Sequence, residues 1–274
     1  MGQRPRLGAQ TVSWQPFNLL LPDAEIALLQ DAAVRLRAYI DGAQHVTTRA
    51  RANSAPNSEA ANLLSRQPIP PELEHAEMRL IGAFEHLGTL SNALVPGNAP
   101  LLFAPFTLMR TALEAAGYAA WAWAPGLSAD QRAERGLRLR WANLDEVIKG
   151  TGDARSRATR DALGVQGGPP AAVDVLGALL PTPYAGGRLG ERLYRQLAGR
   201  GHAMPWVFVG AGKDHVVSDS EHAITVLLRP NLSHLIGALE PTLSVVQIAT
   251  DRFGELAGLG ATDWWIARPT PPTW

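Results

Sequence analysis

The chain has 274 residues, of which 46% are hydrophobic and 18% are charged, and this balance is that of an ordinary globular protein. Twenty-five basic residues offset 25 acidic ones, so no overall field favours nucleic acid or an anionic membrane. There is no cysteine, which excludes disulfides, thiolate zinc sites, iron–sulfur clusters and cysteine nucleophiles.

The N-terminal part predicts an irregular arm, one helix and a connection. Residues 1–21 show no helical periodicity and no continuous apolar run, so we expect an irregular arm, no signal peptide and a cytoplasmic location. Asp23 suits the N-cap of a helix that should end near His45. Residues 47–70 are rich in Ala, Asn, Ser, Arg and Pro and predict a mobile connection, with a short helix over 59–64.

Two long helices should follow as antiparallel neighbours, because the loop between them is short. Pro70 and Pro71 suit the first turn of one helix. Leucines recur in it every seven residues, which predicts a seam of a helical bundle. These leucines are Leu73, Leu80, Leu87 and Leu94. Residues 101–124 are apolar on nearly all sides and predict a helix that is buried by its neighbours.

One stripe of this central helix is polar. The stripe consists of Thr107, Arg110, Thr111, Glu114 and Tyr118, which share a face at helical spacing. A buried arginine and a buried carboxylate are tolerated only when they are paired, so the stripe should face polar groups on other helices or a ligand. Charges in the middle of this apolar run also argue against a transmembrane helix, and we expect no membrane partner.

Arg110 and Glu114 are in the less favourable order for a pair within one helix, so each should also reach another helix. Arg135 or Arg138 could pair with Glu114. Glu77 or Asp145 could pair with Arg110. A polar pocket between these helices is also a place for a small ligand.

The next helix should begin at the capping box Ser128-x-x-Gln131 and end at Gly150 and Gly152. Its expected apolar face consists of Leu137, Trp141, Leu144 and Ile148. Residues 151–187 combine two short helical patterns, over 155–163 and 171–180, with Gly- and Pro-rich stretches. They predict a loop-rich insertion.

A further helix is expected over 189–198. A second capping box, Ser218-x-x-Glu221, predicts a last helix reaching Leu256, which Pro230 and Pro241 must kink or split. Residues 261–274 contain three tryptophans and several prolines and predict an extended tail, which packs on the bundle or meets a protein partner. The whole chain therefore predicts a single all-α domain, a bundle of about five to six helices.

Two short patterns suggest a carboxylate-bridged metal protein. Glu72-x-x-His75 has the spacing of di-metal helical bundles, and Asp219-x-x-His222 is a looser copy. However, both acids fall in the first turn of an expected helix, where the helix dipole favours an acid without any metal. We therefore expect no metal ligand and no cofactor, and keep the metal protein as an alternative.

Arg195 and His202 are separated by six residues in the segment LYRQLAGRGH. This segment resembles a Tyr-x-x-Leu-Ser-x-x-x-His pattern of uncharacterised actinobacterial helical proteins, which are similar to the HEPN superfamily. The Arg-x-x-x-Glu at Arg110 and Glu114, followed by an arginine-rich helix, is similar to that group as well. The chain departs from the pattern at Ala198, where the family has serine, and at Gln196, where nuclease members often have a shorter polar residue.

The resemblance implies an HEPN-like bundle that forms a homodimer and acts as a metal-independent endoribonuclease in a toxin or phage-defence setting. By that resemblance, His202 would handle the proton of a ribose 2′-hydroxyl and Arg195 would hold the scissile phosphate of RNA. Further substrate contacts are expected from Arg192 and Arg200, and from the polar-stripe residues Arg110, Glu114 and Tyr118.

A structural interpretation competes with this one. Arg195 would then pair with a bundle carboxylate such as Glu114, His202 would cap a turn, and the protein would be a non-catalytic binding module with its pocket at Arg110 and Glu114. A second Arg–His pair, Arg229 and His234, is separated by four residues and also fits the spacing of four to six residues that the resemblance implies. We interpret it as a helix start with a structural histidine.

Overall fold

Helices dominate the residues that the structure describes, which are 23–65, 71–95, 104–184, 186–201, 215–220, 223–227, 232–259 and 270–273. In this computed structural model the helices are α1 (Asp23–Ala52), α2 (Glu59–Leu64), α3 (Pro71–Ala93), α4 (Ala104–Ala122), α5 (Ala129–Thr151), α6 (Ala154–Asp161), α7 (Ala172–Leu179), α8 (Leu189–Gly201) and α10 (Leu232–Leu256). The predicted all-α class is confirmed. The predicted arm over 1–21 and most of the predicted tail lie outside the described residues.

Two short antiparallel hairpins accompany the helices in the described residues. β1 (Pro183–Tyr184) pairs with β2 (Gly187–Arg188), and β3 (His215–Ser220) pairs with β4 (Ala223–Leu227). The first hairpin closes the predicted insertion over 151–187, which also contains α6 and α7 close to the two predicted helical stretches. Neither hairpin was expected from the sequence.

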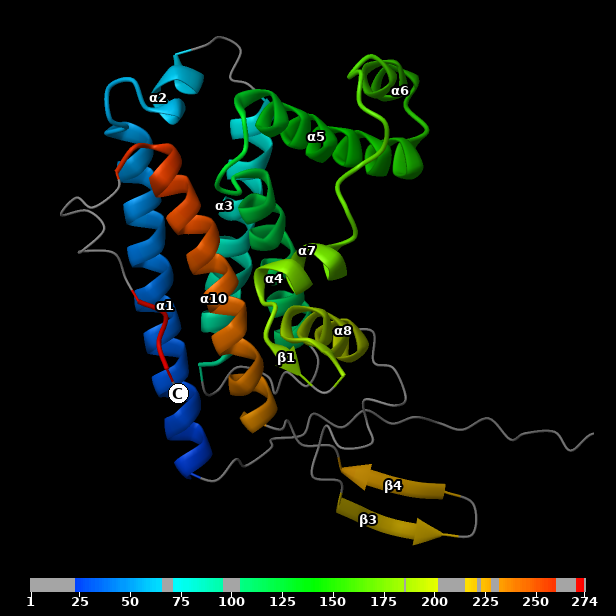
Figure 1. The fold of residues 1–274 in the computed structure, drawn as a ribbon. Coiled ribbons are helices and arrows are strands. Elements are labelled where there is room, and N and C mark those ends of the chain that lie inside the picture. Colours follow the sequence, from blue (N-terminus) through cyan, green and yellow to red (C-terminus); the bar gives the residue numbers. More distant parts are fainter. Residues whose placement is uncertain are drawn as a thin grey trace, which may run out of the picture.

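The central helix of the bundle is α4, against which α3, α10, α8, α7 and α5 all pack (Figure 1). Met109, Leu113 and Ala116 are fully buried, as an almost uniformly apolar helix requires. The outer helix α1 lies against α3 and α10. The predicted burial of the central helix is therefore confirmed.

The leucines spaced by seven form the predicted seam of α3. Leu73, Leu80 and Leu87 are fully buried, and Leu94 is nearly so. A spacing of seven returns each side chain to the same face after about two turns, and α3 makes its most extensive contact with α4. This contact fixes the position of α4 and its polar stripe.

The predicted end of α1 near His45 is wrong. The helix continues to Ala52, so residues 47–52 belong to α1 and not to a mobile connection. Val46 and Ala50 are buried in the core, and packing of the apolar face therefore extends beyond the part that local propensity favours. The short helix α2 lies over the residues predicted for it.

The capping box at the start of α5 is confirmed. The backbone N–H of Gln131 donates to the Ser128 hydroxyl over 3.2 Å, and the Ser128 N–H donates to the Gln131 side chain over 2.9 Å. Gly152, with φ of 70°, ends the helix in the left-handed conformation. The second half of α5 projects from the bundle towards α6 (Figure 1), so its apolar face is only half-buried.

The second predicted capping box is wrong, because Ser218 lies in β3. Residues 215–227 contain several β-branched side chains, and their strand preference outweighs the helical spacing of the few apolar residues there. The last helix, α10, begins only at Leu232 and is not split at Pro241. Pro241 cannot donate to the carbonyl of Gly237, but Gly237 is exposed and water can take its place.

One helix of the described residues, α10, is long and apolar enough to cross a bilayer. This helix also forms a large part of the bundle core, and 56% of its apolar window is buried by the other helices. Leu239, Leu243 and Phe253 are among its buried side chains. The apolar composition of α10 is therefore also that of a helix packed in the core of a bundle.

Candidate functional site

Tyr194 of α8 joins the two charged residues of the polar stripe on α4. The Arg110 Nη2 donates to the Tyr194 hydroxyl over 3.1 Å, and that hydroxyl donates to the Glu114 Oε2 over 3.1 Å. The Arg110 guanidinium also lies over the Tyr194 ring, 5.3 Å from its centroid. Direct contact between Arg110 and Glu114 is longer, at 3.9 Å. The phenol therefore bridges the pair, and the three residues form one network between α4 and α8.

The partners predicted for Arg110 and Glu114 are wrong. The bridging residue, Tyr194, was not among the predicted site residues, although it is the first residue of the Tyr-x-x-Leu pattern. The four residues predicted to pair with Arg110 or Glu114 interact with other groups instead. Glu77 pairs with Arg51, and Asp145 pairs with Arg160 and Lys149. Arg138 pairs with Glu134, and Arg135 donates to the carbonyl of Trp121. Arg135 belongs to α5, but its guanidinium reaches the C-terminal end of α4, where backbone carbonyls lack donors within the helix and attract cations.

Tyr118, the last residue of the polar stripe, makes its contacts with other parts of the bundle. Its hydroxyl donates to the carbonyl of Pro170 over 3.1 Å, and the Arg79 guanidinium lies 5.6 Å from its ring centroid. Burial, with a further contribution from the Glu114 carboxylate, raises the pKa of Tyr118 to about 12. The phenol is therefore a neutral hydrogen-bond donor at physiological pH. Its role here is to hold Arg79 and Pro170, because its hydroxyl is already bonded and only 9% of the residue is exposed.

Arg195 is exposed on the outer face of α8, which it shares with Arg192. It does not pair with Glu114, so that part of the structural interpretation is wrong. Its neighbour Tyr194 points about 100° away around the helix and takes the Glu114 carboxylate instead. His202 lies outside the described residues.

Arg200 and His234 contact each other, although the sequence assigned them to two separate motifs. The Arg200 Nη2 lies 2.9 Å from the His234 Nδ1, and the Arg200 guanidinium is 4.6 Å from the centroid of the Phe106 ring. Because arginine can only donate, the Nδ1 accepts and the ring carries its proton on Nε2. Partial burial and the Arg200 charge lower the pKa of His234, which favours this neutral form. The two residues are 34 positions apart in the sequence, and no local pattern connects them.

We predicted that His234 is a structural histidine at a helix start, and α10 does begin two residues before it, at Leu232. The residue is exposed, but it does support Arg200 at the junction of α8, α10 and α4. The other member of that motif, Arg229, lies outside the described residues. Arg200, which we expected to bind substrate, is half-buried and held by Phe106 and His234.

No group of three or more His, Asp or Glu side chains in the described residues is placed to hold a metal ion. His75 is half-buried on α3, and burial lowers its pKa. The side chains of Glu72, Asp219 and His222 are outside the described part.

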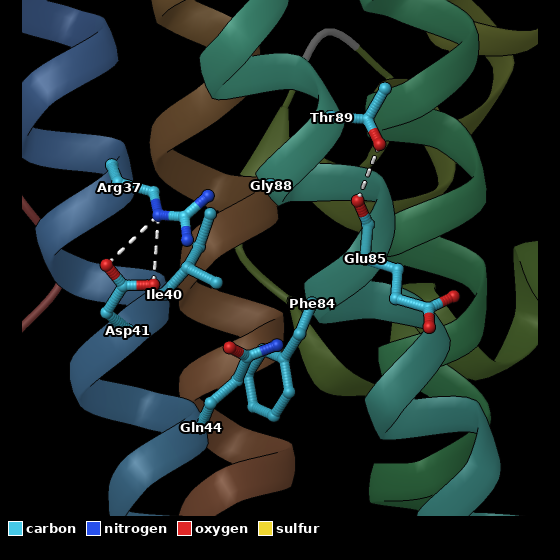
Figure 2. Close-up of a pocket in the computed structure, with 8 residues that line it drawn as sticks. All are labelled: Arg37, Ile40, Asp41, Gln44, Phe84, Glu85, Gly88 and Thr89. Carbon is cyan, nitrogen blue, oxygen red and sulfur yellow. Dashed lines mark hydrogen bonds and ion pairs between the residues drawn. The ribbon is translucent and has the colours of Figure 1, made fainter.

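A polar groove of about 380 Å³ lies between α1 and α3, away from the network. Ile40 and Phe84 lie between the two helices, and the Arg37–Asp41 ion pair stands at the α1 edge (Figure 2). Gly88 leaves the α3 edge open, since a Cβ there would meet no atom within 4 Å. The only ion pair in the groove is exposed and satisfied, and nothing there concentrates charge on a ligand.

Comparisons with known proteins do not place the chain in a family. No family model, no curated protein and no solved structure matches it.

Proposed function

We propose that the protein is a metal-independent endoribonuclease that binds RNA along the exposed face of α8. The observation that carries the proposal is the exposure of Arg195. The sequence offered two roles for this arginine, holding a phosphate or pairing inside the bundle with Glu114. The second role is filled by Tyr194 and Arg110, which leaves Arg195 exposed on the face of α8 that also carries Arg192.

In the proposed reaction Arg195 holds the scissile phosphate through its planar fork and stabilises the charge that grows on the phosphate oxygens. His202 takes the proton of the ribose 2′-hydroxyl, because imidazole titrates near neutral pH. The 2′-oxygen then attacks the phosphorus, the bond to the 5′-oxygen breaks, and the leaving 5′-oxygen takes up a proton from water, so that a 2′,3′-cyclic phosphate and a 5′-hydroxyl result. The Arg110–Tyr194–Glu114 network holds α8 on α4 and so positions Arg195.

The proposal includes a second copy of the chain, in the toxin or phage-defence setting that the resemblance implies. Two α8 helices would then contribute an Arg195 and a His202 each to one groove. Light scattering coupled to size-exclusion chromatography measures the mass in solution. A mass twice the monomer is expected, and a monomer at micromolar concentration would remove the dimer from the proposal.

The test of activity is cleavage of a labelled single-stranded RNA in the presence of EDTA. We expect His202→Ala and Arg195→Ala each to lower the cleavage rate by about a hundredfold or more, the usual contribution of a general acid–base group or an oxyanion donor. Arg157→Ala is the matched control, because Arg157 is an exposed arginine on α6. Equal cleavage by all four proteins, or none by the wild type, would refute the proposal.

A second candidate is a non-catalytic binding module that holds a ligand at Arg110 and Glu114. It is favoured by the exposure of these side chains, 29% and 31%, which keeps the network open to solvent. Fluorescence anisotropy of labelled RNA separates the two candidates. RNA binding that Arg110→Gln weakens, without any cleavage, supports the binding module and argues against the nuclease.

A further inference from the structure

The hairpin β1–β2 presents an exposed tyrosine beside the start of α8 (Figure 1). Tyr184 of β1 is 52% exposed, and it is the only exposed aromatic side chain in the part of the chain that the structure describes. β1 and β2 are joined by two residues, and β2 runs directly into α8 at Leu189. A single exposed apolar side chain is common on protein surfaces, so the groups around Tyr184 decide whether it has a role.

The register of the hairpin fixes the side of it from which the Tyr184 ring projects. Tyr184 pairs directly with Gly187, and directly paired residues of antiparallel strands have their Cβ atoms on the same face, about 5 Å apart. A Cβ on Gly187 would lie 3.4 Å from the Glu191 Oε2 and 3.6 Å from the Arg192 Nε. The face of the hairpin that carries Tyr184 is therefore the face on which Arg192 lies.

Two glycines keep the surface between the ring and the guanidinium open. Gly186 has φ of 80°, a conformation that favours glycine, and a Cβ there would lie 3.5 Å from the Arg192 Nη2. Gly187 likewise has no side chain to fill the space between Tyr184 and Arg192. The Tyr184 Cβ and the Arg192 Nε thus lie within about 9 Å of each other. The base and the phosphate of one nucleotide span a comparable distance.

Positive charge surrounds the tyrosine. Arg188, Arg192 and Arg195 lie within eight residues of sequence, and Glu191 is the one acid among them. The Glu191 Oε1 accepts a hydrogen bond of 2.6 Å from the Arg188 Nε. One carboxylate cannot neutralise three guanidinium groups, so this surface attracts anions.

We propose that the β1–β2 hairpin and the first turns of α8 bind single-stranded RNA, with one base stacked on Tyr184 and the adjoining phosphates held by Arg192 and Arg195. An exposed ring beside guanidinium groups suits an unpaired strand, because any base can stack on the ring while the arginines follow the backbone. A duplex fits less well, since its bases are already stacked on each other. The choice of RNA rests on the proposed function, and the inference adds the recognition of an unpaired nucleotide.

The experiment measures binding of a labelled single-stranded RNA with 2′-O-methyl riboses by fluorescence anisotropy. This RNA has no 2′-hydroxyl to attack the phosphate, so its affinity can be measured whether or not the protein is a nuclease. Tyr184→Ala should weaken binding by about tenfold, the usual effect of losing one stacked base. Tyr184→Phe keeps the ring and should bind like the wild type. Met78→Ala is the matched control, because Met78 is 61% exposed on α3, and it should also bind like the wild type.

The salt dependence of binding separates the ring from the arginines. Each phosphate contact with a single strand contributes about 0.7 to the slope of log affinity against log salt concentration. Arg192→Gln should therefore lower the slope by about 0.7. Tyr184→Ala should lower the affinity and leave the slope unchanged. Arg157→Gln, on the exposed face of α6, is the control for charge and should change neither quantity.

Three results would overturn the proposal. They are equal affinity of Tyr184→Ala and the wild type, an equal loss in Tyr184→Phe and Tyr184→Ala, and binding of the matching duplex as tight as that of the single strand. Loss of a dimer in Tyr184→Ala, measured by light scattering, would assign the ring to a contact between two copies and also count against it.

The inference and the proposed nuclease can fail separately. Binding that depends on the Tyr184 ring, without cleavage of ordinary RNA, would support the inference and refute the nuclease. Cleavage of ordinary RNA, with the same affinity in Tyr184→Ala and the wild type, would support the nuclease and refute the inference.

Discussion

Replacing Tyr194 with phenylalanine removes one oxygen atom from the α4–α8 contact and tests the network directly. The hydroxyl accepts one hydrogen bond from Arg110 and donates one to Glu114, both over 3.1 Å. A hydrogen bond to a charged group contributes about 1.5–3 kcal/mol when it is well shielded from water. Both charged side chains are about 30% exposed, so water replaces part of each lost bond. The phenyl ring keeps the stacking with Arg110. We therefore expect the free energy of unfolding to fall by about 1–2 kcal/mol.

The assay is urea unfolding followed by circular dichroism, with the wild type, Tyr194→Phe and Tyr184→Phe side by side. Tyr184 is the matched control, because it lies in β1 and is 52% exposed. Tyr184→Phe should change stability by less than about 0.5 kcal/mol. If Tyr194→Phe is as neutral as this control, the phenol does not bridge Arg110 and Glu114 in solution, and our account of how α8 is held on α4 is wrong.

Three further predictions concern packing, capping and pH. Gly190→Ala would place a Cβ 2.0 Å from the backbone oxygen of Leu176, so urea unfolding should show a loss of stability of about 3 kcal/mol or more. In the control Gly82→Ala the new Cβ meets no atom within 4 Å, and this variant should be neutral or stabilising. Ser128→Ala breaks the capping box of α5 and should cost about 1 kcal/mol, measured in the same way; no loss would mean that the box is not formed. The folded-state pKa of His75 is lowered from 6.5, so the unfolded chain takes up the proton first on acidification, and stability should fall as pH decreases from about 6.5 towards the folded-state pKa and then level off. His75→Gln should reduce the dependence of stability on pH. An unchanged dependence would show that protonation of His75 is not its cause.

The sequence predicted the helices whose apolar periodicity is long and regular. The leucine seam of α3, the buried α4 and the capping box of α5 are local patterns, and packing reinforces each of them. The errors occur where two tendencies compete. The end of α1 depends on burial of Val46 and Ala50 by other helices. The hairpin β3–β4 depends on β-branched residues in a stretch that also has weak helical spacing.

The candidate site was predicted as a set of residues but not as an arrangement. The polar stripe on α4 followed from its spacing, because residues four apart share a helix face. Tyr194 as the bridge, and Arg200 as the neighbour of His234, join residues 80 and 34 positions apart, and no local pattern encodes such pairs. A short Arg–His spacing likewise does not say which way an arginine points.

The sequence by itself determined that this chain is a helical bundle around one apolar helix with a charged stripe, because burial requires apolar faces and helical spacing reveals them. Only the tertiary structure decided which groups satisfy that stripe. A buried or half-buried charge takes the nearest partner with the right geometry, and distance in space depends on how helices cross. Tyr194 reaches Glu114 for that reason, and Arg195, one residue further along α8, stays in solvent.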